Sequence, residues 1–195
     1  MMFDLIKGNL IHKLAFIDWD YVDIGTGNTI YPFASIGTSA EFPGKDSIGR
    51  VVIGNNNTIR EHVVINRSVD AITSIGDNNY LMNHSYIAHD VTIEDDCTLA
   101  CSSMVAGYSY IMNGSFLGMG SAIHQYCIVG SYSLLGLNSV VTKKSSILPG
   151  NIYAGIPIKL LKKYIIGLSR KNIDEYTLEI ENISYFNLKN EYHIK

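Results

Sequence analysis

The sequence predicts an all-β fold, a parallel β-helix with a short helical tail at its C-terminus. The first observation is a period of six: every sixth residue from Ile75 to Ile147 is Ile, Leu or Val. The second is that the fifth position of most of these hexads is small, as in Ser85, Cys97 and Ser103. A large aliphatic residue that fills the interior and a small residue beside a sharp corner are typical of a hexapeptide-repeat β-helix.

The period begins near Ile24 and is broken twice before it becomes regular. The first break, residues 41–47, contains a Pro-Gly pair that is typical of a loop. The second break spans residues 66–74. Because loops that leave a regular scaffold often carry function, we expect both breaks to contact substrate.

The repeat ends at Pro157, so we expect a β-helix domain over residues 1–158 and a short helical tail over residues 159–195. In the tail, apolar residues recur at helical spacing: Leu160, Leu161, Tyr164, Ile165 and Leu168. A second helical stretch is expected over residues 172–186, with the apolar residues Ile173, Tyr176, Ile180 and Ile183. We expect this tail to pack back on the coils.

Composition argues against several classes of function. A chain of 195 residues fits one domain with a short appendage. The net charge of −3, without a long basic run, argues against a nucleic-acid partner. No apolar stretch of about 18 residues is present, so no membrane span is expected, and the N-terminal residues show no secretory signal. The three cysteines do not form a disulfide pattern, which favours a cytoplasmic protein.

The repeat also predicts which residues meet in space. Three hexads make one triangular coil, so residues eighteen apart stack on neighbouring coils about 4.8 Å apart. His89, Gly107 and Gln125 then form one corner column, and His124 lies beside Gln125. His89 and His124 are expected about 10 Å apart, two coils away from each other. Between them lies the small pair Ala106-Gly107, so we expect a hollow that suits a small site.

Three short segments stand out from the repeat: IAHD at residues 87–90, AIHQYCIVG at residues 122–130 and NTIRE at residues 57–61. Together they resemble the UDP-N-acetylglucosamine acyltransferase family of lipid A synthesis. The resemblance covers about residues 24–136. It implies a left-handed coil, a homotrimer, and active sites in clefts between subunits.

The resemblance also implies roles for residues. His89 corresponds to the general base, Asp90 to the acid beside it, and Gly107 to the donor of a backbone N–H to the oxyanion. His124 and Gln125 correspond to the wall of the acyl cleft. These roles suit acyl transfer, because removing a proton from an attacking hydroxyl or amine needs a base that titrates near neutral pH. A backbone N–H aimed at the developing negative charge stabilises it.

The chain departs from that family at several positions. Tyr86 and Tyr108 stand where the family has histidines. Leu137 replaces the small residue that lets a long acyl chain pass along the helix. Because displacing a packed leucine is unfavourable, Leu137 predicts a short acyl chain. The family's nucleotide-sugar loop has no counterpart in residues 38–45.

The end of the repeat resembles the hexapeptide acetyltransferases instead. Residues 151–159, which include Ala154, Gly155 and Lys159, resemble the strip along which those enzymes hold the pantetheine of acetyl-CoA. We therefore expect transfer of an acetyl group from acetyl-CoA to a hydroxyl or amine of a sugar, nucleotide-linked, in lipopolysaccharide or surface-glycan synthesis, without a permanently bound cofactor. The alternative is a longer-chain transferase that takes its acyl group from acyl carrier protein (acyl-ACP) and acts on UDP-N-acetylglucosamine in lipid A synthesis.

Two further classes of protein stay open: a zinc-dependent carbonic anhydrase and a non-catalytic β-helix subunit. His84 and His89 are five residues apart, like two of the zinc ligands of trimeric β-helix carbonic anhydrases. A catalytic zinc needs three protein ligands, and no third histidine falls at a suitable column, so no metal is expected. The other class is a non-catalytic β-helix subunit, which would keep IAHD without thioester turnover. In an acyltransferase, His84 is expected at a subunit interface or on the acceptor side.

Overall fold

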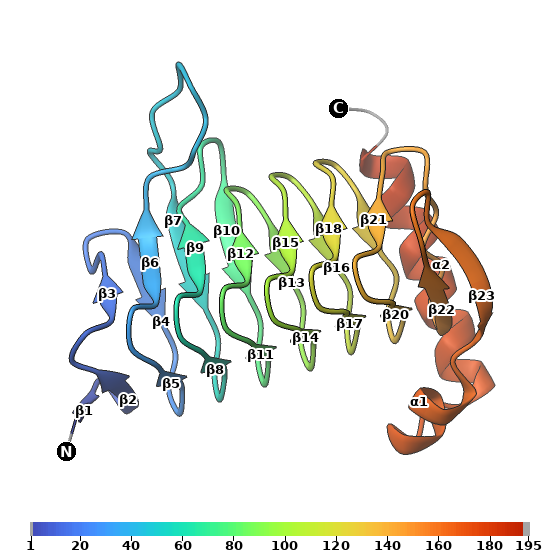
Figure 1. Ribbon diagram of the computed structural model, residues 1–195, viewed down its shortest axis with the longest axis horizontal. Helices are drawn as coiled ribbons and strands as arrows, with labels where there is room; N and C mark the ends of the chain where they lie inside the picture. The colour runs from blue at the N-terminus through green and yellow to red at the C-terminus, as the bar shows by residue number, and fades with distance from the viewer. Residues whose placement is uncertain (1, 193–195) are drawn as a thin grey trace.

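The computed structural model describes residues 2–192 and shows a parallel β-helix with three faces (Figure 1). Face 1 contains β1 (Phe3–Ile6), β2 (Asn9–His12), β5 (Thr29–Ile30), β8 (Thr58–Ile59), β11 (Tyr80–Leu81), β14 (Thr98–Leu99), β17 (Phe116–Leu117), β20 (Leu134–Leu135), β22 (Asn151–Ala154) and β23 (Lys159–Lys163). Face 2 contains β3 (Phe16–Ile17), β6 (Ser35–Thr38), β9 (Val64–Asn66), β12 (Tyr86–Ile87), β15 (Met104–Val105), β18 (Ala122–Ile123) and β21 (Val140–Val141). Face 3 contains β4 (Val22–Ile24), β7 (Arg50–Ile53), β10 (Ile72–Ile75), β13 (Thr92–Ile93), β16 (Tyr110–Ile111) and β19 (Ile128–Val129).

Strands of successive coils pair in the register that the repeat predicts. Ile87 lies opposite Val105, and Val105 lies opposite Ile123. The aliphatic residue of each hexad points inward: Ile87, Val105 and Leu117 are fully buried. Burying such a side chain contributes about 1.5–3 kcal/mol before the entropy of ordering is counted. The predicted parallel β-helix is confirmed.

The corners repeat with the same period as the core. The residue three positions after the buried aliphatic residue has a left-handed backbone, as at His84 (φ 59), Asp90 (φ 57), Tyr108 (φ 60) and Tyr126 (φ 60). This conformation costs roughly 1–2 kcal/mol for a residue with a side chain, so the surrounding coils hold it. Asp90 and Tyr108 each end a tight turn, which fixes the positions of the residues just before them.

Both predicted breaks in the repeat form loops at the corner between faces 2 and 3. The loop between β6 and β7, residues 39–49, projects beyond the coils (Figure 1). The loop between β9 and β10, residues 67–71, lies beside it and is joined to it by an ion pair between Lys45 and Asp70 (Nζ to Oδ1, 3.3 Å). The two loops therefore form one structural unit over the corner between faces 2 and 3.

The tail begins with a strand and continues as two helices. Residues 159–163 form β23, which pairs antiparallel with β22 and extends face 1. The prediction that Leu160 and Leu161 belong to a helix is wrong, because the backbone of β22 offers an unpaired edge that β23 fills. Then follow α1 (Ile165–Arg170) and α2 (Glu175–Tyr192), which give the predicted helical tail; residues 193–195 lie outside the described residues.

The side of helix α2 that packs on the last coils differs from the side that the sequence predicted. Tyr185 is 1% exposed and clusters with Met112 and Ile128 of the coils. Ile180 and Ile183, which were predicted to pack on the coils, are exposed instead. The helix carries apolar residues on both sides, so periodicity alone does not identify the buried one.

Candidate active site

His89 and Asp90 form a buried pair at the corner between face 2 and face 3. They lie in the turn between β12 and β13, and their side chains are 9% and 3% exposed. His89 Nδ1 lies 2.9 Å from Asp90 Oδ2. The sequence predicted this pair, and the structure brings its two side chains into hydrogen-bond contact.

The loop between β9 and β10, residues 67–71, holds the carboxylate of Asp90 in position. The backbone N–H groups of Val69, Asp70 and Ala71 donate to its two oxygens at 2.8, 3.1 and 2.8 Å. An ionised carboxylate accepts all of these bonds together with one from His89, whereas a protonated one would turn a donor toward donors. We therefore assign the Nδ1 proton to His89 from the hydrogen-bond network, which leaves Nε2 with the lone pair that a general base needs.

Gly107 lies directly beside the imidazole of His89. A β-carbon on residue 107 would stand 2.6 Å from His89 Cε1 and 2.7 Å from Nε2. Any side chain at this position would therefore push the ring away. The hollow predicted between His89 and His124 is thus partly filled by the His89 ring itself.

In the described chain, the register of the coils leaves the backbone N–H of Gly107 without an acceptor. Within residues 2–192, the neighbouring amides of Ala106 and Tyr108 donate to Ile123 and His89, while the Gly107 N–H has no protein acceptor. The Gln125 amide, one coil further on, has none in the described chain either. The fold leaves an unused donor on successive coils, and the missing side chain at Gly107 lets the His89 ring lie against this part of the backbone, which is buried in the single chain.

Two aromatic residues enclose His89. Phe42 of the first loop contacts the ring edge-to-face at a centroid distance of 5.3 Å, and Tyr108 does so at 5.1 Å. The Tyr108 hydroxyl donates to the Asp70 carboxylate, which also pairs with Lys45. Burial, followed by this hydrogen bond, raises the pKa of Tyr108, while the Tyr108 hydroxyl holds the pKa of Asp70 below its usual value. Phe42, Lys45 and Asp70 were not predicted individually, since only their position in the two loops marked them.

The residues that continue the corner column remain open to solvent. His124 and Gln125 are exposed, and His124 Nδ1 lies 3.2 Å from the Gln125 carbonyl oxygen. They share the corner of His89 but lie two coils further along it, as the register requires. Their predicted role as a cleft wall is compatible with this exposure and stays a prediction.

A second group of predicted site residues lies on the opposite edge of face 2. His84, in the turn between β11 and β12, is exposed and stacks on His62 at 4.8 Å. Leu137, in the turn between β20 and β21, is 63% exposed. Tyr86 lies between the two edges on β12, packs against the core, and has its pKa raised by burial. His84 and Leu137 therefore face away from His89 of the same chain.

The acetyltransferase-like strip lies on that second edge too. Ala154 ends β22, Lys159 begins β23, and the carbonyl oxygen of Gly155 accepts a bond from the Val140 N–H at 3.4 Å. None of the three contacts His89 or Gly107. The strip and the base of one chain belong to different corners.

The five-residue spacing of His84 and His89 does not bring the two side chains together within one chain. His84 and His89 lie on opposite edges of face 2, so they do not converge on one ion. In the described part of the chain, no three His, Cys, Asp or Glu side chains cluster as metal ligands would. No helix between residues 2 and 192 has the length and apolar character needed to span a membrane.

Comparison with known proteins places this geometry in a family. The family described as bacterial transferase hexapeptide (six repeats) matches residues 72–107. Among curated proteins, the acyl-[acyl-carrier-protein]–UDP-N-acetylglucosamine O-acyltransferase of Synechocystis sp. is 35% identical over 156 residues, which cover 77% of this chain and 55% of the relative. The protein of the same name from Nautilia profundicola is 41% identical over 91 residues, covering 44% of this chain and 34% of that relative. The chain thus spans about half of the first relative and about a third of the second.

Solved structures agree with these relatives. LpxA of Bacteroides fragilis, a UDP-N-acetylglucosamine acyltransferase, superimposes with a TM-score of 0.79 at 34% identity, covering 91% of this chain and 70% of that chain. LpxA of Acinetobacter baumannii gives a TM-score of 0.71 at 29% identity, covering 93% and 83%. The repeat, the fold and this level of identity show that the chain belongs to the hexapeptide-repeat acyltransferase family that includes the UDP-N-acetylglucosamine acyltransferases.

Proposed function

We propose that this protein transfers an acyl group from an acyl-ACP thioester to a hydroxyl of a UDP-N-acetylglucosamine-type nucleotide sugar, as a step of lipid A synthesis. The observation that carries the proposal is the arrangement of His89, whose Nδ1 is held by Asp90 while its ring lies against Gly107, whose amide has no acceptor within residues 2–192. The curated relatives are named as acyl-ACP-dependent O-acyltransferases. They favour this donor over acetyl-CoA, which the sequence had put first.

The chemistry follows from the positions of these groups. The acceptor hydroxyl gives its proton to His89 Nε2 as its oxygen attacks the thioester carbonyl. The carbonyl oxygen becomes negatively charged and accepts the Gly107 N–H, which was not used by the fold. The tetrahedral intermediate then expels the sulfur, and the protonated His89 returns the proton to it, so the products are an ester and a thiol. Asp90 stabilises the charged ring between these two proton transfers.

Phe42 and Tyr108 shape the environment of the reaction. By covering the imidazole from two sides, they limit the access of water, which would compete with the acceptor for the thioester. The Lys45–Asp70 pair joins the two loops over this corner. We infer that the first loop selects the acceptor, since it brings Phe42 to the base.

We further propose that the working enzyme is a homotrimer. His84 and Leu137 lie on the edge of face 2 opposite to His89, so they reach a base only if it belongs to a neighbouring subunit. The outward residues of face 2 include Phe16 and Met104, which are 54% and 47% exposed in the single chain. An apolar face between the two edges suits a subunit contact, and rings of identical subunits close such contacts.

A donor and acceptor screen tests the proposal. Purified protein is incubated with UDP-N-acetylglucosamine or other nucleotide amino sugars, and with acetyl-CoA, short-chain acyl-ACP or long-chain acyl-ACP, and products are identified by mass spectrometry. Formation of an O-acylated nucleotide sugar from acyl-ACP, lost in His89→Ala, supports the proposal. Turnover with acetyl-CoA but not with any acyl-ACP would show that the donor is wrong, and no acyl product from any pair would refute transferase activity.

A further inference from the structure

The backbone and the side chain of Asp70 contact different groups at the corner of His89. Its backbone N–H donates to Asp90 Oδ1 at 3.1 Å, between the N–H groups of Val69 and Ala71, which bond the same carboxylate at 2.8 Å each. Its side-chain carboxylate accepts the hydroxyl of Tyr108. Because Val69 and Ala71 have apolar side chains, it is Asp70 whose side chain connects these three amides to a group outside the loop.

The bond between Tyr108 and Asp70 spans the coil that carries His89. Residues 67–71 belong to the coil before that of His89, and Tyr108 belongs to the coil after it. The Tyr108 ring contacts the His89 ring at a centroid distance of 5.1 Å, and its hydroxyl donates to a residue 38 positions earlier in the chain. The base therefore lies between the two residues along the helix axis.

This bond needs the length of a tyrosine side chain. The family that the sequence resembles has a histidine at the position of Tyr108. The ring nitrogens of a histidine end closer to the backbone than a tyrosine hydroxyl does, so a histidine would not bring a donor to Asp70. The contact is a consequence of two residues of this chain, Tyr108 and Asp70.

The Asp70 carboxylate is ionised and has two partners. The Tyr108 hydroxyl holds the pKa of Asp70 below its usual value, and Lys45 Nζ lies 3.3 Å from Asp70 Oδ1. A hydrogen bond to a charged acceptor is stronger than one between neutral groups. The side chains of the Lys45–Asp70 pair are both exposed, and exposed ion pairs contribute little. Tyr108, half-buried against His89, is therefore the firmer support of this carboxylate.

We propose that Asp70 is a positioning residue of the active site. Through its carboxylate, Tyr108 fixes the loop whose amides hold Asp90, and Asp90 in turn fixes the tautomer and the direction of the His89 ring. Asp70 and Tyr108 transfer no proton themselves and act on His89 through Asp90. The inference rests on the proposed acyl transfer and adds to the base a support from the coils before and after it.

Removing the Tyr108 hydroxyl tests the proposal while keeping the ring. Tyr108→Phe retains an aromatic ring against His89 but leaves Asp70 without this donor. Because a misplacement of about 1 Å can cost about a hundredfold, we expect kcat for acyl transfer to fall by about ten- to a hundredfold. The KM values for donor and acceptor should stay unchanged. An unchanged kcat, or a change confined to either KM, overturns the proposal.

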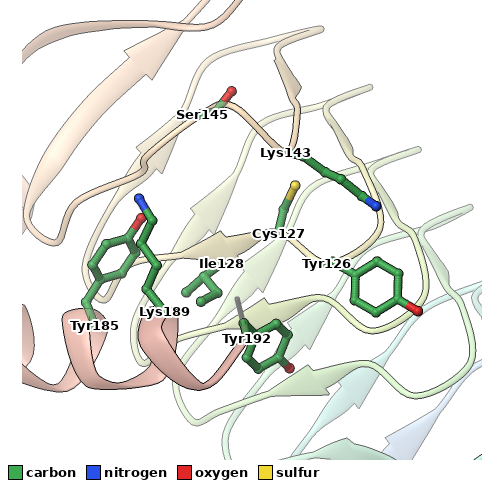
Figure 2. Close-up of a pocket in the computed structure, with 8 residues that line it drawn as sticks. All are labelled: Tyr126, Cys127, Ile128, Lys143, Ser145, Tyr185, Lys189 and Tyr192. Carbon is green, nitrogen blue, oxygen red and sulfur yellow. The ribbon is translucent and has the colours of Figure 1, made fainter. Parts of the chain in front are cut away.

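Tyr126→Phe is the matched control. Tyr126 occupies the same corner one coil beyond Tyr108, and the two rings stack at 4.8 Å. Figure 2 shows the Tyr126 hydroxyl pointing away from the cavity that the labelled side chains line. In the described chain, the side-chain partners of Asp70 are Tyr108 and Lys45, so the control loses the same atom without affecting Asp70. Its kcat should stay at the wild-type value, and an equal fall in both variants overturns the proposal.

Substitutions of Asp70 show whether Tyr108 acts through it. Asp70→Asn keeps an oxygen that accepts the Tyr108 hydroxyl, whereas Asp70→Ala keeps none, so kcat should fall further in the Ala variant. When Tyr108→Phe is added to Asp70→Ala, kcat should fall no further, because the hydroxyl has already lost its acceptor. Losses that multiply in the double variant, or equal losses in the Asn and Ala variants, overturn the inference.

A spectroscopic measurement separates this inference from the proposed function. The proton on His89 Nδ1, bonded to Asp90, is expected to give a downfield proton resonance that His89→Ala removes. Exchange of this proton with water should be about tenfold faster in Tyr108→Phe, because the loop opens more often, and unchanged in Tyr126→Phe. Faster exchange without acyl product from any donor would refute the proposed function and leave the positioning role intact. Acyl transfer with equal exchange in wild type and Tyr108→Phe would overturn the positioning role and leave the function intact.

Discussion

The imidazole of His89 occupies the space that a side chain on Gly107 would need. Its Cε1 and Nε2 lie 2.6 and 2.7 Å from where the β-carbon of residue 107 would stand. The two residues are eighteen positions apart, so the coil itself brings them together. A base and an amide donor that the described coils leave unused thus come from the same column of the repeat.

Gly107→Ala should reduce activity strongly and stability modestly. The new methyl group displaces the His89 ring and crowds the Gly107 amide, and losing one such donor costs about a hundred- to a thousand-fold in kcat. The turn at residue 107 does not need a glycine backbone angle, but the buried His89 ring must move, so the free energy of unfolding should fall by about 1–3 kcal/mol. Ala106→Gly, at the neighbouring position, is a suitable control for a substitution in this turn. Gly44→Ala is not, because Gly44 has a left-handed backbone (φ 83). Activity of Gly107→Ala above about a tenth of wild type would contradict the oxyanion role.

Asp90→Asn should reduce both activity and stability. The amide group presents N–H donors to backbone N–H groups of residues 69–71, and each unsatisfied buried donor costs about 1–3 kcal/mol. The ring of His89 also loses the carboxylate that fixes its tautomer, for which about a ten-thousand-fold loss of kcat has precedent in a catalytic triad. Calorimetry and kcat measurements check the two effects, with the exposed Asp46→Asn as control. A variant with native stability would show that the loop does not depend on this carboxylate.

The sequence predicted the coils, their register and the His89 column because all three follow from one period. Ile87, Val105 and Ile123 stack as expected, and the stacking places Gly107 next to His89. Phe42 and Asp70 lie in loops without a period, and their approach to His89 depends on contacts between segments far apart in sequence. Such contacts leave no local pattern in the sequence from which they could be predicted.

The tail was predicted less well for a related reason. Leu160 and Leu161 fit helical spacing, but hydrogen bonding of β23 to the edge of β22 outweighs that local preference. In α2, apolar residues occur on both sides, and the structure buries Tyr185 rather than Ile183. The hydrogen bond from Lys189 Nζ to Ser146 Oγ could not be inferred without knowing which side of α2 faces the coils.

Leu137→Gly should extend the range of acyl chains that the enzyme accepts. In the proposed trimer, Leu137 projects from one subunit toward the acyl groove that begins at a neighbour's His89. Displacing it would impose about 1–3 kcal/mol of strain, enough for roughly ten- to hundred-fold discrimination against long chains. The test compares kcat/KM for short acyl donors and for hydroxyacyl donors of about ten to fourteen carbons. Preference for the long chains by the unaltered protein would show that Leu137 does not limit the groove.

A trimer should be found by light scattering at micromolar concentration, and its site should be shared between subunits. His89→Ala removes the base, while Leu137→Arg places a charge in the acyl groove of the neighbouring subunit. Each variant alone should be inactive, and trimers assembled from a mixture should regain partial activity, because some interfaces then contain neither lesion. A stable active monomer, or no recovery in mixtures shown by mass spectrometry to have exchanged subunits, would contradict the shared site.

The most direct test of the account is the rate of acyl transfer from acyl-ACP to UDP-N-acetylglucosamine by wild type and His89→Ala, followed by mass spectrometry of the sugar product. The account predicts an O-acylated product from the wild type and a loss of about a hundred- to ten-thousand-fold in kcat for the variant, measured below the variant's melting temperature, which should fall because the buried partner of Asp90 is removed. Retention of more than about a tenth of the wild-type rate would show that His89 is a structural residue and not the base.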